Sequence, residues 1–326
     1  MVTIIGAGWY GCYIASKLKE KDIKFEILEK NSEIFKGSSG FNQNRLHQGF
    51  HYPMDYNTRY TSKIGFEKFL KVFPGLSRKF KNNLYAIHKN SNIDFETYLS
   101  IYSYEKNNFE PRILEEYKNF KNYKGIISVN EHLIDFKKSK DFFLSMNLPI
   151  KYNTTCEYKS DNIYANNKRI SSDLIFDCTY GQLKTPLGFF NENFISFIYK
   201  KNKNTLFEAL TVMNGPFYSI FPYFNDLYTV TGVCEGVINE KEFKLYGKEK
   251  YIKEKRKLLE DKISKDYDLF LNDFSYENHF ISSKTKPFSQ TDSRSTFLFK
   301  KDKIITVSSG KIDTIFELDL FLEKLF

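Results

Sequence analysis

Three glycines and one acid near the start of the chain have the spacing of a dinucleotide-binding turn. Gly6, Gly8 and Gly11 follow an apolar strand-like run and open a helix-like stretch, and a second apolar run then ends at Glu29. Gly6 permits the tight turn, Gly8 lets backbone N–H groups approach a pyrophosphate, and Gly11 lets the helix pack close to the strand. The helix N-terminus attracts phosphate charge, and Glu29 can accept hydrogen bonds from ribose hydroxyls.

The polar loop from Lys36 to Pro53 is the second feature that could do chemistry. It is rich in Gly, Ser and Asn and holds His47 and His51. A base with a pKa near 6 to 7 can take the proton that an alcohol loses on oxidation. Gly49 and Pro53 favour a loop over a helix at this point. The other three histidines lack such surroundings and are expected to be structural or exposed: His88, His132 and His279.

The composition is typical of a globular chain of about two domains. The chain has 326 residues, of which 41% are hydrophobic, 17% aromatic and 27% charged. The net charge of +9 suggests nucleic-acid binding, but only seven of the 49 basic residues are arginines and the lysines are mixed with acids along the chain. This pattern suits an AT-rich genome better than a binding patch, so no nucleic-acid partner is expected.

Cysteines and apolar runs give no sign of a disulfide-rich, metal-binding or membrane protein. The four cysteines form no C-x-x-C pair, and Cys12 and Cys178 lie in apolar runs, where burial is expected. The apolar start lacks a basic n-region and contains the glycine turn, so it does not fit a signal peptide. No run approaches the roughly 20 apolar residues of a membrane span. A soluble, cytoplasmic protein is expected, with its oligomeric state open.

Apolar periodicity and turn residues predict the elements that position these features. Helices are expected at 60–72, at 95–120 with a break at Pro111, at 135–146 with Asp135 as N-cap, at 241–265 as a solvated charged helix, and from about Lys311 to the end. Strands are expected at 83–88, 126–129, 148–152 and 174–179, in a meander over 156–170, in an antiparallel sheet over 194–233, and at 295–300 and 304–307.

Five segments of the chain resemble, in family order, FAD-dependent oxidoreductases of the D-amino-acid-oxidase-like (DAO) superfamily. The loop 37–52 is similar to that of L-2-hydroxyglutarate dehydrogenases and related enzymes, which carry His-x-Gly-x-x-Tyr. The other segments are the unit 4–29, the strand-turn-Asp entry at 126–136, the strand ending in Thr179-x-Gly181, and the closing strand-Gly-helix segment 292–315. Two departures are Cys178-Thr179-Tyr180-Gly181 for the usual Ala-Thr-Gly, and Ser309-Gly310-Lys311 where many relatives are Gly-rich.

The resemblance implies an α/β fold (α+β overall) with a Rossmann-like FAD-binding domain of glutathione-reductase type and an inserted antiparallel β-sheet substrate domain. Residues 1–80, 125–185 and 290–326 would form the discontinuous FAD-binding domain, and residues 81–124 and 186–289 the substrate or cap domain. An NAD-binding Rossmann domain shares the first unit. It would be contiguous, however, whereas β-rich insertions separate the pieces here, so FAD is favoured.

The resemblance also implies which residues hold FAD. Ser38 and Ser39 would lie near the pyrophosphate, and Asn44 and Arg45 would border the flavin. Lys311 and the N-terminus of the last helix would stabilise negative charge on the reduced ring. Plain turns or a solvated loop stay open as alternatives for these segments. The predicted cofactor-binding residues are Gly6, Gly8, Trp9, Tyr10, Gly11, Glu29, Lys30, Ser38, Ser39, Asn44, Arg45, Leu46, Thr155, Cys156, Thr179, Gly181, Gly310, Lys311 and Ile312.

The implied reaction is hydride transfer from a substrate C–H to flavin N5, from a sugar-like alcohol, a 2-hydroxy acid or an amine. The predicted catalytic residues are His47, His51, Tyr52 and Arg294, and His47 is favoured because it matches the family's His-x-Gly position. Compact relatives often accompany surface-polysaccharide genes, so a sugar derivative is the favoured substrate, with an electron acceptor as partner. The alternatives are a flavin-binding protein without redox turnover, an NAD-dependent dehydrogenase, and structural roles for His47 and Arg294.

Overall fold

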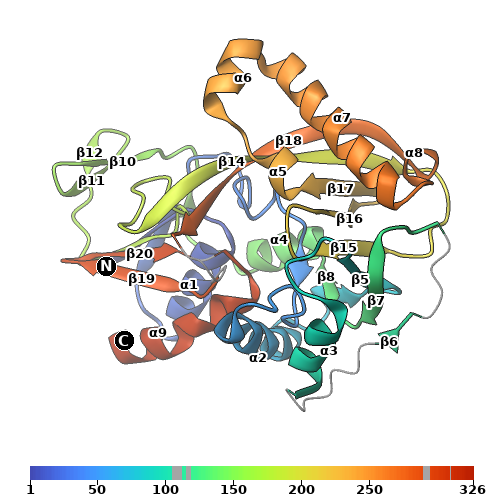
Figure 1. The fold of residues 1–326 in the computed structure, drawn as a ribbon. Coiled ribbons are helices and arrows are strands. Elements are labelled where there is room, and N and C mark those ends of the chain that lie inside the picture. Colours follow the sequence, from blue (N-terminus) through green and yellow to red (C-terminus); the bar gives the residue numbers. More distant parts are fainter. Residues whose placement is uncertain (105–111, 115–118, 289–293, 309) are drawn as a thin grey trace.

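The computed structural model describes residues 1–104, 112–114, 119–288, 294–308 and 310–326 (Figure 1). Two large sheets and two small ones organise the chain. The predicted helix break at Pro111 lies outside the described residues, as do Asp292 and Ser309.

The six-stranded sheet joins stretches from the beginning, the middle and the end of the chain. Its order is β19-β20-β13-β1-β2-β9, and every neighbouring pair is parallel except β19 with β20. This is a Rossmann-like sheet assembled from distant segments, as the sequence predicted. Its strands, in sheet order, are β19 (Phe297–Lys301), β20 (Ile304–Ser308), β13 (Leu174–Asp177), β1 (Val2–Ile5), β2 (Phe25–Leu28) and β9 (Ile150–Lys151).

Helices of the same region pack into one apolar core with this sheet. They are α1 (Trp9–Glu20), α2 (Tyr56–Val72), α4 (Phe136–Ser145), the 3₁₀ helix η1 (Asp313–Glu317) and α9 (Leu318–Leu325). Asp135 caps α4 as predicted, because its carboxylate accepts a hydrogen bond of 3.0 Å from the backbone N–H of Lys138. The last helix differs from the prediction, since regular α-helix begins at Leu318 rather than near Lys311.

The eight-stranded sheet has the order β18-β14-β17-β16-β15-β5-β7-β6, and β5 with β15 is its one parallel pair. The antiparallel sheet predicted over 194–233 is therefore present, enlarged by strands from both sides. Its strands are β5 (Asn83–His88), β6 (Arg112–Ile113), β7 (Tyr123–Val129), β14 (Phe189–Lys201), β15 (Ala209–Met213), β16 (Tyr218–Phe224), β17 (Leu227–Gly232) and β18 (Phe274–Pro287).

Helices cover the outer face of this sheet (Figure 1). These are α5 (Val233–Gly236), α6 (Glu240–Tyr246), α7 (Lys248–Asp266) and α8 (Phe270–Asp273). Gly247, with a φ of +80°, separates α6 from α7, so the single helix predicted over 241–265 is interrupted. Buried Leu259 and Ile263 show that α7 is amphipathic and only its other face is solvated.

The opposite side, called the inner face here, turns toward the loop that precedes α2. Nε2 of Gln43 in that loop lies 3.1 Å from Oγ1 of Thr229 on β17. A small sheet of β3 (Arg45–Leu46), β8 (His132–Ile134) and β4 (Ser77–Lys79) fixes the loop, since Arg45 pairs with Leu133. The remaining elements are α3 (Phe95–Tyr104) and the predicted meander of β10 (Cys156–Lys159), β11 (Asn162–Ala165) and β12 (Lys168–Arg169).

The two large sheets suggest a two-part division of the chain. Strand β7 belongs to the eight-stranded sheet, although the expected boundary at residue 125 assigns most of it to the FAD-binding part. The domain boundaries stay a proposal. Within the described residues, no helix has both the length and the apolar character that crossing a membrane requires. The cytoplasmic location stays a prediction.

Gly65 is the position where α2 crosses η1 most closely, and its substitution tests this packing. A Cβ added there would lie 1.9 Å from the carbonyl oxygen of Asp313, a contact that only backbone movement can relieve. We expect Gly65→Ala to lower the free energy of unfolding by about 3 kcal/mol, at the upper end of overpacking effects. Urea unfolding followed by circular dichroism measures the loss.

Gly37→Ala is the matched control, because no atom lies within 4 Å of its added Cβ. Equal unfolding midpoints for the two variants would show that α2 and η1 are not packed as tightly as described.

Candidate active site

The glycine turn has the close contacts that its sequence predicts. Gly6 has a φ of +97°, and its N–H donates to the carbonyl of Leu28 at 2.8 Å. A Cβ on Gly11 would lie 1.9 Å from the carbonyl oxygen of Gly6, so helix and strand could not keep this separation with any other residue. The turn therefore holds the N-terminus of α1 at the carboxyl end of β1, where open α/β sheets bind ligands.

The N-terminus of α1 forms a cradle that suits a pyrophosphate. A Cβ on Gly8 would lie 2.7 Å from Oγ of Ser39, so a side chain there would fill the space between turn and loop. The backbone N–H of Trp9 donates to Oγ of Ser39 at 3.0 Å. The N-cap residue, Gly8, has no side chain to cap the helix, and the first turn holds no acid, so the N–H groups that follow Trp9 remain available to an anion.

Glu29 lies at the opposite end of the expected cofactor path. It is buried, and its carboxylate accepts a hydrogen bond of 2.7 Å from the backbone N–H of Ala7. It also accepts one from the backbone N–H and one from the side-chain amide of Asn31. Oε1 receives both bonds from Asn31, whereas Oε2 receives the one from Ala7, so the second lone pair of Oε2 could accept a ribose hydroxyl. The N–H of Thr154 donates to the carbonyl of Glu29, which brings exposed Thr155 and half-buried Cys156 alongside. Lys30 is exposed next to Glu29.

Two predicted cofactor residues have side chains in the core. The indole of Trp9 stacks on Phe35 at 5.4 Å between ring centroids, and Leu46 is fully buried. Only the main chain of Trp9 and Leu46 could therefore face a ligand. Tyr10 instead joins α1 to the end of the chain, because its hydroxyl donates to the carbonyl of Lys311 at 2.7 Å.

Thr179 and Gly181 form a turn that contacts strand β18. Thr179 donates to the carboxylate of Asp177 through both its N–H and its hydroxyl. Gly181 has a φ of +74°, and a Cβ there would lie 2.7 Å from Oγ1 of Thr285. Thr285 in turn donates to the carbonyl of Tyr180.

Strand β18 also contacts the loop that holds Ser38 and Ser39, called the serine loop here. Oγ of Ser38 donates to the carbonyl of Ser283 at 3.0 Å. These contacts bring two of the predicted cofactor-binding segments to the edge of the larger sheet.

Four of the predicted site residues lie together at the loop 47–52, called the histidine loop here: His47, His51, Tyr52 and Lys311. His47, His51 and Tyr52 are mutual neighbours, with ring centroids 4.9 to 5.9 Å apart. The loop is a turn, as predicted, because the N–H of Tyr52 donates to the carbonyl of Gly49 at 3.0 Å. Nζ of Lys311 lies 3.9 Å from the centroid of the Tyr52 ring, so the end of the chain meets this loop.

Glu131 is a buried acid that sequence analysis did not single out. Its carboxylate accepts hydrogen bonds from the N–H of Gln48 at 2.8 Å, the hydroxyl of Tyr85 at 2.7 Å and the amide of Asn83 at 3.1 Å. Nδ1 of His47 lies 3.7 Å from the same carboxylate. The residue follows strand β7 in a connection that has no motif, so only the folded chain reveals the contact.

Both loop histidines are neutral at physiological pH. Burial lowers the pKa of His47 well below its ordinary value, and the charges of Lys311 and Arg45 lower it further. Burial, then Arg45, lowers the pKa of His51 in the same way. Burial and these cations outweigh the attraction of Glu131 for a proton on His47, because 3.7 Å is too long for a hydrogen bond. The expected base with a pKa near 6 to 7 is thus not found in either unliganded histidine.

Arg45 extends from the loop onto the inner face of the larger sheet. Its guanidinium lies 3.5 Å from the centroid of the Phe221 ring and donates to Oγ1 of Thr211 and to Oε1 of Gln43. Nε2 of Gln43 is within 3.3 Å of hydroxyls on two neighbouring strands, β16 and β17. Asn44 beside them has a φ of +49° and a buried Oδ1 without a hydrogen-bond partner in the described structure.

Arg294 and Gly310 lie next to each other. A Cβ on Gly310 would lie 3.1 Å from Cδ of Arg294 and 3.9 Å from the hydroxyl of Tyr180. The expected helix N-terminus at Gly310 and Lys311 is wrong, because η1 begins only at Asp313. Lys311 lies 3.8 Å from buried Asp313, and Ile312 is half-buried against the core, so side-chain charge rather than a helix dipole acts here.

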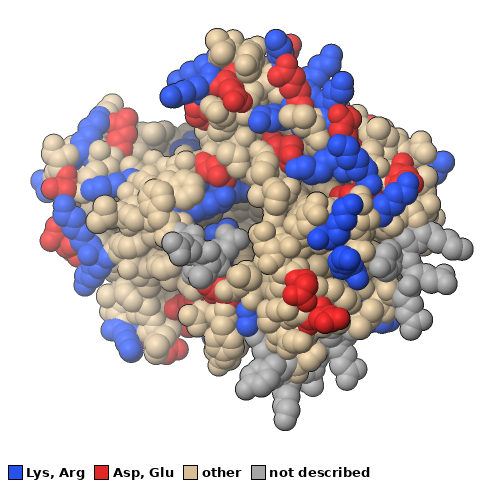
Figure 2. All heavy atoms as spheres, in the orientation of Figure 1, with Lys and Arg blue, Asp and Glu red and all other residues tan. Residues whose placement is uncertain are grey.

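Figure 2 shows a hollow near the centre of one face of the molecule, with Lys and Arg atoms visible inside it. Among the described residues, no group of three His, Cys, Asp or Glu side chains could hold a metal ion. All four cysteines are free thiols; Cys12 is buried as predicted, and Cys178 is half-buried.

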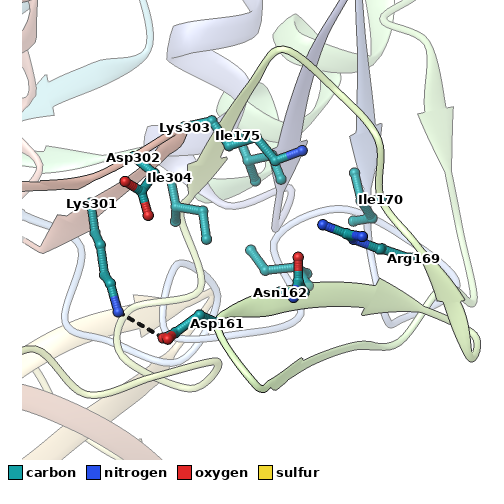
Figure 3. Close-up of a pocket in the computed structure, with 10 residues that line it drawn as sticks. Asp161, Asn162, Arg169, Ile170, Ile175, Lys301, Asp302, Lys303 and Ile304 are labelled. Carbon is teal, nitrogen blue, oxygen red and sulfur yellow. Dashed lines mark hydrogen bonds and ion pairs between the residues drawn. The ribbon is translucent and has the colours of Figure 1, made fainter.

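A separate cavity of about 220 Å³ lies at the other end of the Rossmann-like sheet (Figure 3). Ile175 and Ile304 line it from the amino-terminal ends of β13 and β20, opposite the glycine turn. Its charged rim includes the ion pair between Lys301 and Asp161 at 2.7 Å. This cavity does not coincide with the converging residues.

The three histidines outside the loop have polar side-chain partners elsewhere in the structure. His88 is 3.4 Å from Asp266, Nδ1 of His132 contacts Ser77, and that of His279 contacts Tyr276.

Comparison with known proteins agrees with this arrangement. A model of the NAD(P)-binding Rossmann-like domain matches residues 4–73. The FAD-dependent monooxygenase FPY4 of Fusarium mangiferae is 29% identical over 330 residues, which cover 96% of this chain and 87% of that protein.

Solved structures are similar over the whole chain. L-α-glycerophosphate oxidase from Mycoplasma pneumoniae, solved with FAD bound, has a TM-score of 0.72 at 15% identity and covers 99% of this chain and 94% of its own. Glycine oxidase from Bacillus cereus has a TM-score of 0.71 at 12% identity, over 100% and 95%. The predictions of this fold, of FAD as cofactor and of an oxidoreductase are confirmed.

A different cation has the largest effect on the pKa of each loop histidine, and this difference can be tested. Lys311 is the charge that lowers the pKa of His47 most, and Arg45 the one that lowers the pKa of His51 most. We expect Lys311→Gln to raise the pKa of His47 more than that of His51, and Arg45→Gln to do the reverse. NMR titration of isotope-labelled histidines measures both.

His132 is the internal control, because the causes that lower its pKa are burial and Lys79. If neither variant moves either loop histidine, the cations do not set the charge of the loop.

Proposed function

We propose that this chain, an FAD-dependent oxidoreductase with a D-amino-acid-oxidase-like fold, takes a hydride from a carbon bearing a hydroxyl or amino group. The observation that carries the proposal is the convergence of three distant segments. Lys311 lies over the ring of Tyr52, beside His47 and His51, and Gly310 borders Arg294 and Tyr180. These groups meet at the carboxyl edge of the Rossmann-like sheet, where an FAD ring would enter from the glycine turn.

The residues present fit the cofactor. The cradle at Gly8 and Ser39 would hold the pyrophosphate, Glu29 the ribose, and the segment around Thr155 the adenine. Arg45 and Lys311 would border the flavin, with Lys311 supplying positive charge. When bound, FAD supplies the hydride acceptor.

The histidine loop would handle the proton. Both imidazoles are neutral, and Nδ1 of His51 has no hydrogen-bond partner among the described residues, so each can accept a proton from a substrate hydroxyl or ammonium. Glu131 holds the backbone of Gln48 and would fix the ring of His47. Tyr52 closes the loop over both rings.

A hydroxylated substrate suits the inner face. Hydroxyl side chains of Thr211, Ser219, Thr229 and Thr231 gather around Arg45 and Gln43 there, and they offer both donors and acceptors. This supports a sugar derivative over a simple amine, with a 2-hydroxy acid as the next candidate. A separate electron acceptor completes the reaction.

Monooxygenation is a second candidate, since the relative aligned along most of both chains is named for it. The two reactions differ in atoms: a dehydrogenation adds no oxygen to the product, whereas a monooxygenase inserts one from O₂. Turnover under ¹⁸O₂ with mass analysis of the product separates them.

Anaerobic mixing with a panel of sugars, hydroxy acids and amino acids tests the main proposal. The yellow absorbance should bleach with at least one substrate. A flavin that binds but is never reduced by any of them would favour a non-redox role, and a colourless protein that cannot be reconstituted would remove the cofactor assignment.

Removing the imidazole of His47 tests the proton step. We expect His47→Ala to lower kcat by about 10²- to 10⁴-fold, the usual contribution of a general base, while flavin content stays unchanged. Stopped-flow flavin reduction measures the rate. His279→Ala is the control, because that residue lies on β18 toward the outer helices. Full turnover by His47→Ala would exclude His47 from the chemistry.

A further inference from the structure

Two basic side chains on the inner face have no acidic partner. The first is Arg45, whose guanidinium donates to the neutral oxygens of Thr211 and Gln43. Its Nε is buried without a hydrogen-bond partner, and no ion pair joins its guanidinium to a carboxylate in the described part of the chain. A guanidinium removed from water in this way has an unused donor and no acid in direct contact with its charge.

The second is Lys284 on strand β18. Its Nζ lies 3.1 Å from the centroid of the Phe194 ring, a cation–π contact that leaves its N–H donors free to bind an acceptor. The residue opposite it in the sheet, Glu192, pairs with Lys286 instead, at 2.6 Å. Within the described residues Lys284 therefore has no ion-pair partner.

Strand geometry puts Lys284 on the inner face with Arg45. Alternate residues of a strand share a face, so Lys284 lies on the same side as Phe280. The ring of Phe280 contacts Tyr223 and Phe41, both of which belong to the inner side. The charges of Arg45 and Arg294 each lower the pKa of Lys284, which agrees with their lying near it on the inner face.

The neighbours of Lys284 along the strand lie against the predicted cofactor segments. The carbonyl of Ser283 accepts a hydrogen bond from Ser38, and Thr285 donates to the carbonyl of Tyr180. Lys284 thus stands where the flavin side of the site meets the sheet.

The acids nearby are already engaged. Asp313 is paired with Lys311, and Glu131 accepts three hydrogen bonds from its own surroundings. Glu131 attracts Arg45, and Glu192 attracts Lys284, only from a distance, so in the described chain no acid directly contacts either cation. An anion bound between them could make that contact.

We infer that Arg45 and Lys284 form a cationic subsite for an acidic group of the substrate, and that Lys284 takes up a proton when this group binds. The inference rests on the proposed function, since it names the substrate class of the same site. The acidic group is a carboxylate or a tetrahedral oxyanion such as a phosphate or sulfate.

The coupling to a proton follows from the surroundings of Lys284. Burial lowers the pKa of Lys284 to about 7, and the charges of Lys286, Arg294 and Arg45 contribute, while Glu192 opposes them. An anion beside Nζ favours the charged form and raises that pKa. Below pH 7 the amine of Lys284 is already protonated, so anion binding takes up no proton. Above pH 7 the neutral amine must take up a proton from solvent when the anion binds.

Acetate and sulfate are suitable probes, because neither offers a C–H that the flavin could oxidise. Perturbation of the flavin spectrum gives their Kd from pH 6 to 9. For the wild type we expect Kd to be constant below about pH 7 and to rise up to about tenfold per pH unit above it. Acetamide, the uncharged analogue of acetate, should bind weakly at every pH. The tighter of the two anions identifies the acidic group.

Two substitutions separate charge from proton uptake. Lys284→Arg keeps a cation that does not lose its proton, so Kd should become independent of pH. Lys284→Gln should weaken acetate and sulfate binding at pH 6 by at least tenfold. Lys200→Gln, which removes an exposed lysine from β14, should behave like the wild type.

A pH-independent Kd in the wild type, or unchanged binding by Lys284→Gln, would overturn the inference. NMR of ¹³C-labelled lysines provides a readout that needs no flavin. One lysine resonance should titrate with a pKa near 7. Acetate should raise this pKa, and the resonance should be absent from Lys284→Arg. This result stands even if the protein proves redox-inactive, so the two proposals fail separately.

Discussion

The burial of Glu131 is the constraint on which the arrangement of the site depends. A carboxylate removed from water is costly unless it is hydrogen-bonded, and this one is satisfied by a loop backbone and by two side chains of strand β5. Burial still raises the pKa of Glu131, and the nearby charges of Lys311 and Arg45 oppose that rise. The histidine loop, the larger sheet and the end of the chain are thereby tied to one acid.

Strand β18 gives the site its second fixed wall. It pairs with β14 over nearly its whole length, and it also contacts the serine loop and the turn at Tyr180. A strand anchored on both sides can hold a side chain such as Lys284 with little freedom, which loops alone rarely achieve. The site therefore has a sheet on one side and two loops, both held by hydrogen bonds, on the other.

Local patterns predicted the parts of the molecule that local physics controls. The glycine turn, the Asp135 cap, the meander and the two-histidine loop are each specified within about twenty residues, and each is present. The predicted start of the last helix was wrong, because the packing of η1 on α2 determines the backbone conformation there. Glu131 and Lys284 were missed since their surroundings come from residues far away in sequence. Trp9 was assigned to the cofactor from its place in the motif, but its ring packs in the core.

The strand order of the Rossmann-like sheet has a consequence for synthesis of the chain. Strand β1 is complete within the first few residues, yet one of its neighbours is β13, and the next strand, β20, ends at Ser308. Pairings between segments so far apart form slowly, and β1 must remain without its full set of partners while the ribosome is still elongating. The nucleotide-binding edge is consequently among the last parts to be completed. A complete nucleotide-binding edge therefore requires that synthesis has passed Ser308, and until β13 has been made the apolar strand β1 lacks one of its two neighbours.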